Sequence, residues 1–521
     1  MLGSTIHEYA FIRACITLLR LVAPASLIYL SSCIYTKSFT LNSATPSWIF
    51  AIALFEASFY VFVYRPRKKT LQKVCSIYTA PPLNRQQRET LFHQCSQPVS
   101  LPQDSDSTYP LGWFSSPNLK RENLVEWILW ALFSCSPEQA GTYAHEHVQG
   151  EWKDEIDGYV KNIEELLGMK VEEGHTEKTT SLRLTLDPVK MVHRPLIWYM
   201  IVCLVDTVTS VKLYTLGFRH YSPELSYKRV FPPRIVTLIS KASATNHFSY
   251  WYRPHKSLDR DPIVFIHGIG IGLHPYVPFF QDLIRLDPNQ GFLLVELLPV
   301  SMHMCSSISS DPPTPTIPPR REMLDALYTT MYSLKMSRAV LASHSYGTVI
   351  AAHVIRDQGE TSDASVDSSP QIRQSIFTAH LLIDPIPFLL HLPDVAFNFL
   401  YRIPQGANEW QLWYFASRDP DIAFTLGRCF FWAENILWKE DLDKVKFAVV
   451  LSEKDQIVPA PLVRRYLTGE DEVKSSGLSS DLSNLEVLYY PGLDHAMIFD
   501  TKERRRGMVR ILDRFSRTHS E

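Results

Sequence analysis

One serine lies in a segment where a nucleophile is expected. Residues 339–342 (AVLA) are apolar enough for a buried strand, residues 343–347 (SHSYG) follow directly, and a helical pattern begins at Thr348. A serine on a sharp turn between a strand and a helix is exposed, and the helix N-terminus behind it favours developing negative charge. Ser345 is therefore the candidate nucleophile. The usual pattern G-x-S-x-G has glycine where this chain has Ser343.

A histidine and an aspartate that could activate this serine follow two later strand-like runs. A serine hydroxyl is a weak nucleophile until a base accepts its proton, and a histidine base needs an acid that holds its tautomer. Asp455 follows the apolar run 447–451 (FAVVL), and His495 follows the run 485–490 (LEVLYY). The chain order serine, aspartate, histidine, with each residue beyond a different strand, is the order expected of a triad built on one sheet.

Other acidic residues compete for the role of the acid. Asp384 also follows a strand-like run, residues 378–383 (TAHLLI), and it is the alternative acid. Asp494 adjoins His495 and is interpreted as a loop residue, because neighbours in sequence point in different directions. Taken singly, Asp455 is typical of a turn or a helix cap, and His495 of a loop. Their order and strand context, together with the serine, favour a catalytic triad.

A glycine-rich turn upstream supplies candidate donors for an oxyanion. Residues 267–272 (HGIGIG) directly follow the strand-like run IVFI. The backbone N–H groups of Ile269 and Tyr346 are predicted to hold the oxyanion, and His267 and Gly268 are predicted to support the loop. A nucleotide-binding loop is the competing interpretation, but the glycine spacing matches neither G-x-G-x-x-G nor a P-loop.

Strand and helix patterns alternate after Ser249. Nearly continuous apolar strands that alternate with helices predict an α/β fold, with a parallel sheet covered on both faces and chemistry at the carboxyl ends of the strands. The expected strands are 263–266, 292–297, 339–342, 378–383, 447–451 and 485–490, and the clearest helical patterns are 321–334 and 348–356. The aromatic-rich stretch 386–445 is predicted to form a helical cap over an apolar pocket, with many of its rings filling the cap's own core.

The sequence resembles the α/β-hydrolase superfamily, in particular membrane-anchored fungal members of the AB hydrolase-1 type. The segments that carry the resemblance are HGIGIG (267–272), SHSYGT (343–348), EKDQIVP (453–459) and GLDHA (492–496). It covers residues 249–516, and it implies an eight-stranded, mostly parallel sheet with a cap after the sixth strand. It also implies acyl-enzyme chemistry at a serine, with no metal and no organic cofactor. The superfamily contains lyases, acyl transferases and inactive relatives as well, so the resemblance does not fix the reaction.

By position, the resemblance gives each candidate residue a role. Ser345 is the nucleophile, His495 is base and then acid, and Asp455 orients it. The N–H groups of Ile269 and Tyr346 are the oxyanion donors. The expected hydrolase domain spans residues 248–521 and includes the cap.

Two apolar runs in residues 1–70 are predicted to anchor the chain in a membrane. Residues 47–64 (SWIFAIALFEASFYVFVY) can cross about 30 Å of hydrocarbon as a helix, and only Glu56 interrupts them. Residues 16–35 form a second run, which an arginine and a proline interrupt. The basic cluster 65–69 (RPRKK) predicts that the body of the protein faces the cytoplasm. Buried helices of a soluble domain and a cleaved signal peptide are the alternatives.

Residues 71–247 are predicted to be mainly helical, and the sequence gives them no role. Helices are expected at 122–133, where one face is strongly aromatic, and at 154–167. The apolar stretch 195–218 contains Asp206 and Lys212, which favours a buried or interfacial helix over a third membrane crossing.

The composition excludes several classes of protein. The 52 basic and 54 acidic residues give a formal net charge of −2, so no positive field attracts phosphates and nucleic-acid binding is not expected. The eight cysteines show no CxxC spacing, so neither a zinc site nor a disulfide framework is predicted.

The sequence thus predicts a membrane-anchored serine hydrolase that cleaves an ester or thioester of a lipid or a secondary metabolite. A non-catalytic membrane scaffold, and an acyl transferase or cyclase with the same triad, are the alternative functions. The expected partners are a hydrophobic ester and the membrane, and the endoplasmic reticulum and the lipid droplet are the candidate compartments.

Overall fold

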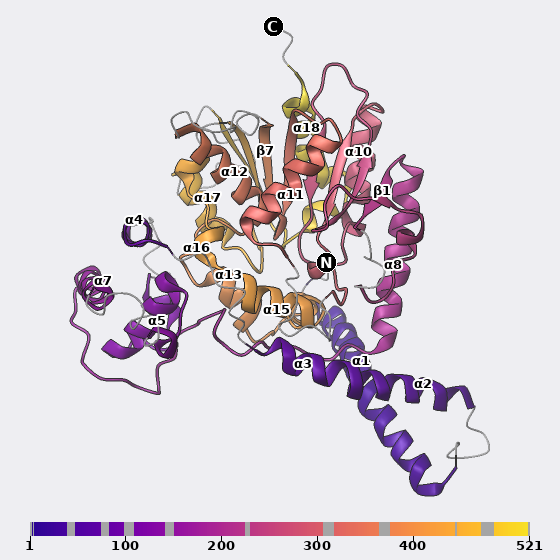
Figure 1. The fold of residues 1–521 in the computed structure, drawn as a ribbon, viewed down its shortest axis with the longest axis horizontal. Coiled ribbons are helices and arrows are strands. Elements are labelled where there is room, and N and C mark those ends of the chain that lie inside the picture. Colours follow the sequence, from indigo (N-terminus) through magenta and orange to yellow (C-terminus); the bar gives the residue numbers. More distant parts are fainter. Residues whose placement is uncertain are drawn as a thin grey trace.

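A mixed β-sheet carries helices on its two faces (Figure 1). The computed structural model describes residues 3, 5–38, 47–73, 83–97, 109–140, 151–223, 230–305, 317–363, 376–442, 445–469 and 484–518. The strands are β1 (Arg219–Ser222), β2 (Lys241–Ala242), β3 (Ser249–Arg253), β4 (Ile263–Ile266), β5 (Phe292–Glu296), β6 (Ala339–His344), β7 (Phe377–Ile383), β8 (Lys446–Ser452) and β9 (Leu485–Tyr490).

The strand order is β2-β1-β3-β5-β4-β6-β7-β8-β9. β3 runs antiparallel to both β1 and β5, and the strands from β5 through β9 pair in parallel. The carboxyl ends of β4, β6, β7, β8 and β9 therefore meet at one edge of the sheet. The loops that carry the candidate site all leave from this edge.

Both faces of β4 to β8 are buried, which explains why their sequences are mostly apolar. In β8, for example, Phe447 and Val449 belong to one core and Ala448 and Val450 to the other. The first core lies under α11 (Arg320–Ser333), α12 (Gly347–Asp363) and α17 (Ala460–Thr468), and the second lies under α10 (Val277–Leu286) and α18 (Lys502–Ser516).

The chain between β7 and β8 forms the helical segments of a cap. They are α13 (Asp394–Ala396), η7 (Phe397–Tyr401), α14 (Ala407–Leu412), η8 (Trp413–Ser417), α15 (Pro420–Cys429), α16 (Trp432–Asn435) and η9 (Lys439–Leu442), where η denotes a 3₁₀ or π segment. Part of this stretch packs on the core of the sheet, and part packs on the first helix of the chain.

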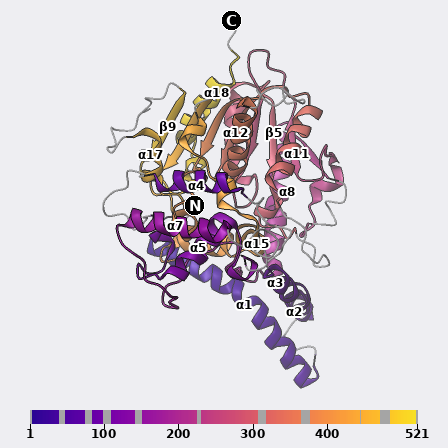
Figure 2. The ribbon, with the colours of Figure 1, turned by 60° about the vertical axis from the view of Figure 1, so that its left-hand side comes forward.

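A small group of helices before the sheet lies beside the cap. It comprises α4 (Arg85–Ser96), η3 (Leu111–Trp113), α5 (Arg121–Phe133) and α7 (Glu151–Leu167). Figure 2 shows α5 and α7 below the sheet. Two indole N–H groups join the two parts: Trp113 donates to the carbonyl of His391, at 2.7 Å, and Trp432 donates to that of Ala131, at 3.1 Å. The region with no predicted role is thus packed onto the cap.

The N-terminal helices protrude from the body as a hairpin (Figure 1). α1 (Ile6–Thr36) packs along α2 (Ser47–Ser58), which continues through η1 (Phe59–Tyr64) into α3 (Arg65–Leu71). Three helices are long and apolar enough to cross a membrane: Ile6–Thr36, Ser47–Leu71 and α8 (Leu196–Thr215). α8 is followed by β1, and η4 (Ile235–Ile239) lies between β1 and β2.

One expectation about the sheet needs correction. The sheet has nine strands rather than eight, because the two-residue strand β2 extends its edge. β1 begins at Arg219, before residue 248, and the start of the hydrolase domain at residue 248 stays a prediction. β1 and β2 are short and partly polar, so they lack the apolar run by which the parallel strands were predicted. The six predicted strands match β4 to β9 to within two residues at each end.

Candidate active site

Ser345 occupies a strained turn between β6 and α12. Its φ of +50° lies in the left-handed region, which is unfavourable for a residue with a side chain. The Ser345 N–H donates to the carbonyl of Ile383 at 3.0 Å, which holds the turn. A Cβ on Gly347 would lie 2.3 Å from the carbonyl oxygen of Ile266, so only glycine fits two residues after the serine. This is the geometry of a nucleophile elbow.

Ser343, which replaces the usual first glycine of the elbow, is fully buried at the end of β6. Its hydroxyl makes no hydrogen bond to any described residue. The extra hydroxyl is thus desolvated and has no partner among the described residues. Such a group costs about 1–3 kcal/mol of stability.

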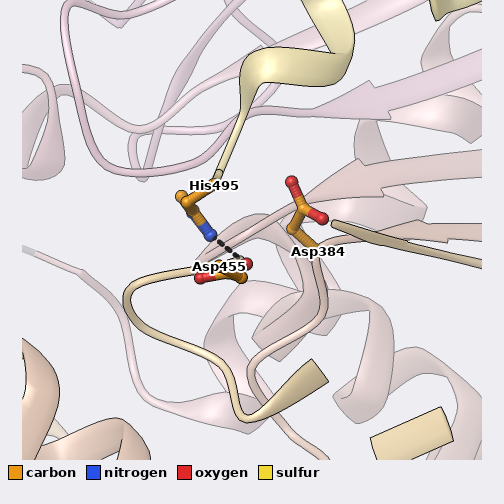
Figure 3. A group of neighbouring side chains, drawn as sticks. All are labelled: Asp384, Asp455 and His495. Atoms are coloured by element: carbon orange, nitrogen blue, oxygen red, sulfur yellow. Dashed lines mark hydrogen bonds and ion pairs between the residues drawn. The ribbon is translucent and has the colours of Figure 1, made fainter. Parts of the chain in front are cut away.

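The structure brings Ser345, His495 and Asp455 together from three loops. The Ser345 Oγ lies 2.9 Å from the Nε2 of His495. The Nδ1 of His495 lies 2.6 Å from the Oδ2 of Asp455, and Figure 3 shows this second pair. In the neutral imidazole, a carboxylate at Nδ1 requires that this nitrogen carries the proton, so Nε2 then presents a lone pair to the serine hydroxyl. The other oxygen of Asp455 accepts from the N–H groups of Ile457 and Val458, at 2.8 and 2.9 Å.

The fold can be identified from the strand order and from the turn that carries Ser345. Two antiparallel strands precede a parallel sheet in which β5 and β4 are exchanged relative to chain order. The serine follows the next strand along the chain, and the aspartate and the histidine follow β8 and β9. The chain has the α/β-hydrolase fold.

Comparisons with known proteins find solved structures that match this chain only at low sequence identity. The sequence matches no protein-family model and no curated protein. Among solved structures, a bacterial membrane phospholipase A is 13% identical, with 61% of this chain and 94% of that chain covered and a TM-score of 0.36. A carboxylesterase of the thaumarchaeon Nitrososphaera gargenis is 14% identical, covering 52% and 98%, with a TM-score of 0.34. The 2-hydroxy-6-oxo-6-phenylhexa-2,4-dienoate hydrolase of Rhodococcus is also 14% identical, covering 52% and 96%, with a TM-score of 0.33.

The charge balance around His495 favours its protonated form. Burial opposes the charge, but the carboxylates of Asp455, Asp384 and Asp494 outweigh it and raise the pKa of His495 to about 9. The imidazolium that forms when a histidine accepts a proton is therefore stabilised here. Because the same carboxylates favour the protonated form, His495 must lose this proton before it can act as a base.

Asp384, the alternative acid, does not hydrogen-bond to His495. Its Oδ1 accepts from the N–H of Ser452 at 3.0 Å, and its Oδ2 accepts from the N–H of Ala496 at 2.9 Å. Figure 3 shows it beside the bonded pair of Asp455 and His495. Each oxygen thus accepts from one backbone N–H, one at the end of β8 and one directly after His495, and the Nε2 of His344 lies 3.8 Å from the Oδ2. Asp455, and not the alternative acid Asp384, is thus the carboxylate that hydrogen-bonds to His495 in this structure.

Asp384, Asp455 and His495 also form the one cluster within the described residues that could hold a metal ion. A metal ligand must offer an unprotonated atom. The Nδ1 of His495 is occupied as a donor to Asp455, and both oxygens of Asp384 accept backbone N–H groups. These groups are thus engaged by hydrogen bonds within the protein itself.

The glycine-rich loop lies against the elbow. A Cβ on Gly268 would come within 2.6 Å of the Ser345 Cβ, so this position also requires glycine. His267 is fully buried; its Nδ1 donates to the Gly268 carbonyl at 2.7 Å, and its Nε2 accepts from the N–H of Leu297 at 2.9 Å. His267 therefore braces the loop and carries no free ring nitrogen.

The two predicted oxyanion donors flank Ser345. Ile269 lines the same cavity as Ser345, and Tyr346 directly follows the serine. In the part of the chain that the structure describes, neither of their N–H groups donates a hydrogen bond. Both donors thus remain available to an incoming group.

Sequence reasoning missed two residues that organise the site. The Tyr276 hydroxyl accepts from the N–H of Gly268 at 3.2 Å and bonds the Nδ1 of His344 at 2.8 Å. Asp494, interpreted as a plain loop residue, accepts from the N–H groups of both Gln456 and His495, at 2.9 and 2.7 Å. It therefore ties the loop of the acid to the loop of the base. No sequence pattern marks Tyr276, whereas the position of Asp494 beside the histidine is a usable signal.

A cavity that is partly open to solvent lies over Ser345. Apart from Ser345, every residue that lines it is apolar or aromatic: Trp113, Trp130, Leu184, Ile269, Ile386, Leu390, Leu392, Val395, Ala396, Phe399, Leu400, Leu426, Phe430, Trp432 and Ile457. Three come from the helical region before the sheet, and most of the others come from the cap. Only a few of the cap's many rings line the cavity.

Proposed function

We propose that this protein is a membrane-anchored serine hydrolase that cleaves an ester or thioester of a hydrophobic acid through an acyl-enzyme. We also propose that it is related to the membrane-anchored fungal hydrolases that its sequence resembles. The observation that carries it is the hydrogen-bonded chain from Ser345 through His495 to Asp455, which opens onto an apolar cavity.

The reaction begins when Ser345 attacks the acyl carbonyl. His495 takes the hydroxyl proton at Nε2, and Asp455 stabilises the imidazolium. The oxyanion accepts hydrogen bonds from the N–H groups of Ile269 and Tyr346, each worth roughly 10²–10³ in rate. The tetrahedral species collapses, and His495 gives its proton to the leaving alcohol or thiol. Water, deprotonated by His495, then attacks the acyl-serine, and the proton returns to Ser345 as the acid leaves.

The cavity favours an apolar acyl group. The indole N–H groups of Trp113, Trp130 and Trp432 donate to protein oxygens, at 2.7, 3.0 and 3.1 Å, so none of them is available to a ligand. A polar acyl group would lose its water without gaining hydrogen bonds, whereas a hydrocarbon chain gains about 0.8 kcal/mol per buried CH₂. We therefore propose a lipid or a similarly apolar secondary metabolite as the substrate class.

The membrane part of the proposal rests on the α1–α2 hairpin. Large apolar side chains on both helices face outward, among them Ile28 and Phe55, at 69% and 68% exposure. Glu56, the one acidic residue of the second run, is turned inward and accepts from the N–H of Leu196 at 2.8 Å. The exposed lysines of α3 follow the hairpin, which favours a cytoplasmic position of the body at the endoplasmic reticulum or the lipid droplet.

Turnover of short- and long-chain p-nitrophenyl esters by the full chain in detergent tests the proposed reaction. The wild type should release p-nitrophenol, and Ser345→Ala should lose at least 10³-fold in kcat. Equal rates for the two proteins would contradict the proposal and favour a scaffold. Product analysis with an added alcohol separates hydrolysis from acyl transfer, and alkaline carbonate extraction tests the anchor. Release into the supernatant would contradict the membrane spans.

A further inference from the structure

The outward face of α8 is apolar along four turns. Its exposed residues between positions 197 and 211 are Ile197, Met200, Ile201, Leu204, Val208 and Val211, each 39–64% exposed. Apart from the adjacent pair Met200 and Ile201, they recur every three or four residues and so form one stripe. None of the residues exposed in this interval is polar, and the first exposed charge, Lys212, comes directly after it. A stripe of this length is unusual on a surface in contact with water.

The short helix η4, which is joined to α8 by an ion pair, adds three exposed apolar residues to this stripe. Ile235, Leu238 and Ile239 are 56–80% exposed. Arg234, directly before η4, makes two hydrogen bonds to the carboxylate of Asp206 on α8, at 3.0 and 2.9 Å. We call these nine apolar residues of α8 and η4 the α8–η4 face.

The opposite side of α8 is fixed to the body of the protein. Val202 and Leu213 are fully buried, the Thr209 hydroxyl lies 2.8 Å from the Nδ1 of His274, and the ring of Tyr214 packs on Trp251 at 5.1 Å. If α8 crossed a bilayer, the polar surface of the sheet domain beside it would enter the hydrocarbon. A helix held in this way can contact lipid with one face only.

The α8–η4 face begins next to α2, the second helix of the membrane hairpin. The N–H of Leu196, at the start of α8, donates to Glu56 on α2 at 2.8 Å, and the Nε2 of His193 lies 2.9 Å from the same carboxylate. Figure 1 shows α8 along one edge of the sheet domain, with one end near α3. The bilayer that holds α1 and α2 is therefore continuous with the start of the α8–η4 face.

Cations lie at the far end of the face. Lys212 and Arg219 are exposed at and after the end of α8, and Lys241 is exposed two residues after Ile239. An apolar face with flanking lysine and arginine side chains fits the interface of a bilayer with anionic headgroups.

We propose that the α8–η4 face is a second membrane contact, which lies in the interface of the same bilayer that holds α1 and α2. This inference rests on the membrane anchor of the proposed function and does not depend on hydrolysis. The two contacts together fix the orientation of the sheet domain on the membrane, whereas the hairpin alone leaves it free to tilt.

Photo-crosslinking of the full chain in vesicles tests this contact. Benzoylphenylalanine replaces Leu204 or Leu238 in the face, Phe55 in the hairpin, or Leu258, a fully exposed leucine between β3 and β4 that serves as the matched control. The vesicles contain phosphatidylcholine, phosphatidylserine and a phosphatidylcholine with an alkyne in its acyl chain. We expect lipid adducts at Leu204, Leu238 and Phe55, at least fivefold above the yield at Leu258.

The other outcomes overturn the proposal in different ways. Adducts at Phe55 without adducts at Leu204 and Leu238 would refute the second contact and leave the anchor intact. An absence of adducts at Phe55 as well would refute the anchor itself. Crosslinks from Leu204 to a second copy of the chain in place of lipid would show that the face is a protein interface.

Discussion

The side-chain amide of Asn408 donates a 2.6 Å hydrogen bond to the carboxylate of Asp494, the residue directly before the proposed base. Asn408 lies on α14 of the cap, and α14 packs against α1 of the hairpin. At that contact Ile12 and Ile16 of α1 join Ala407 and Tyr414 in one apolar cluster. The anchor, the cap and the loop of His495 are thus connected by a short series of direct contacts.

We predict that Asn408 positions the base through Asp494. Asn408→Ala should lower kcat about tenfold with little change in KM, because a hydrogen bond to a charged group is worth about 1.5–3 kcal/mol and its loss frees the loop of His495. Steady-state kinetics on a p-nitrophenyl ester measure this. Asn289→Ala, in an exposed loop far from the site, is the control. An unchanged kcat in Asn408→Ala would refute the positioning role.

Activity should rise with pH through the ionisation of His495. The neutral imidazole is the active form, and the neighbouring carboxylates raise its pKa from 6.5 to about 9. The value of kcat/KM is therefore lost as the pH falls through this raised pKa, and its midpoint should lie above 6.5. Asp455→Asn removes the closest carboxylate, so it should move the midpoint down and lower the rate about 10⁴-fold. A wild-type midpoint below 6.5 would contradict this electrostatic balance.

Leu184 should limit the length of the acyl chain. It lines the cavity and comes from the helical region before the sheet. Leu184→Ala should move the preferred p-nitrophenyl ester to a longer chain, and Leu184→Trp should move it to a shorter one, because the two changes enlarge and fill the same space. Leu182→Ala, which removes a leucine that does not line the cavity, is the control. Identical chain-length profiles in all variants would show that this region does not bound the substrate.

Replacing the unusual residue of the elbow should stabilise the protein. Ser343→Ala removes a buried hydroxyl without a partner, so the free energy of unfolding should rise by about 1 kcal/mol and activity should be retained. Ser301→Ala should do the opposite, because the Ser301 hydroxyl donates to the carbonyl of Leu297 at 2.7 Å. Thermal unfolding of both variants provides the measurement. A lower Tm for Ser343→Ala would mean that its hydroxyl has a structural function.

The parts of the fold that could be predicted are those with a strong local signal. The strands β4 to β8 are buried on both faces, so runs such as FAVVL at 447–451 are apolar throughout. The residues just beyond the parallel strands follow from the geometry of a parallel sheet, which is why Ser345, Asp455 and His495 could be singled out. β1 carries Arg219 and His220 in four residues, so it has no such run.

The contacts that could not be predicted join segments far apart in the sequence. Trp113 and Trp130 were visible as aromatic residues, but only their packing on the cap brings them to the cavity. Glu56 interrupts an apolar run, and its pairing with the start of α8 is set by tertiary packing. Trp410 and Tyr414 of the cap pack against the cations of Arg13 and Arg194, with 3.8 and 3.9 Å to the ring centres. No local pattern specifies such partners.

Covalent labelling with a fluorophosphonate tests the central claim most directly. The reagent transfers its phosphonyl group to an activated serine, and peptide mass spectrometry locates the modified residue. We predict a single adduct on Ser345 in the full chain, its loss in Ser345→Ala, and much slower labelling in His495→Ala. A folded wild type without an adduct, or an equal adduct in Ser345→Ala, would show that Ser345 is not an activated nucleophile.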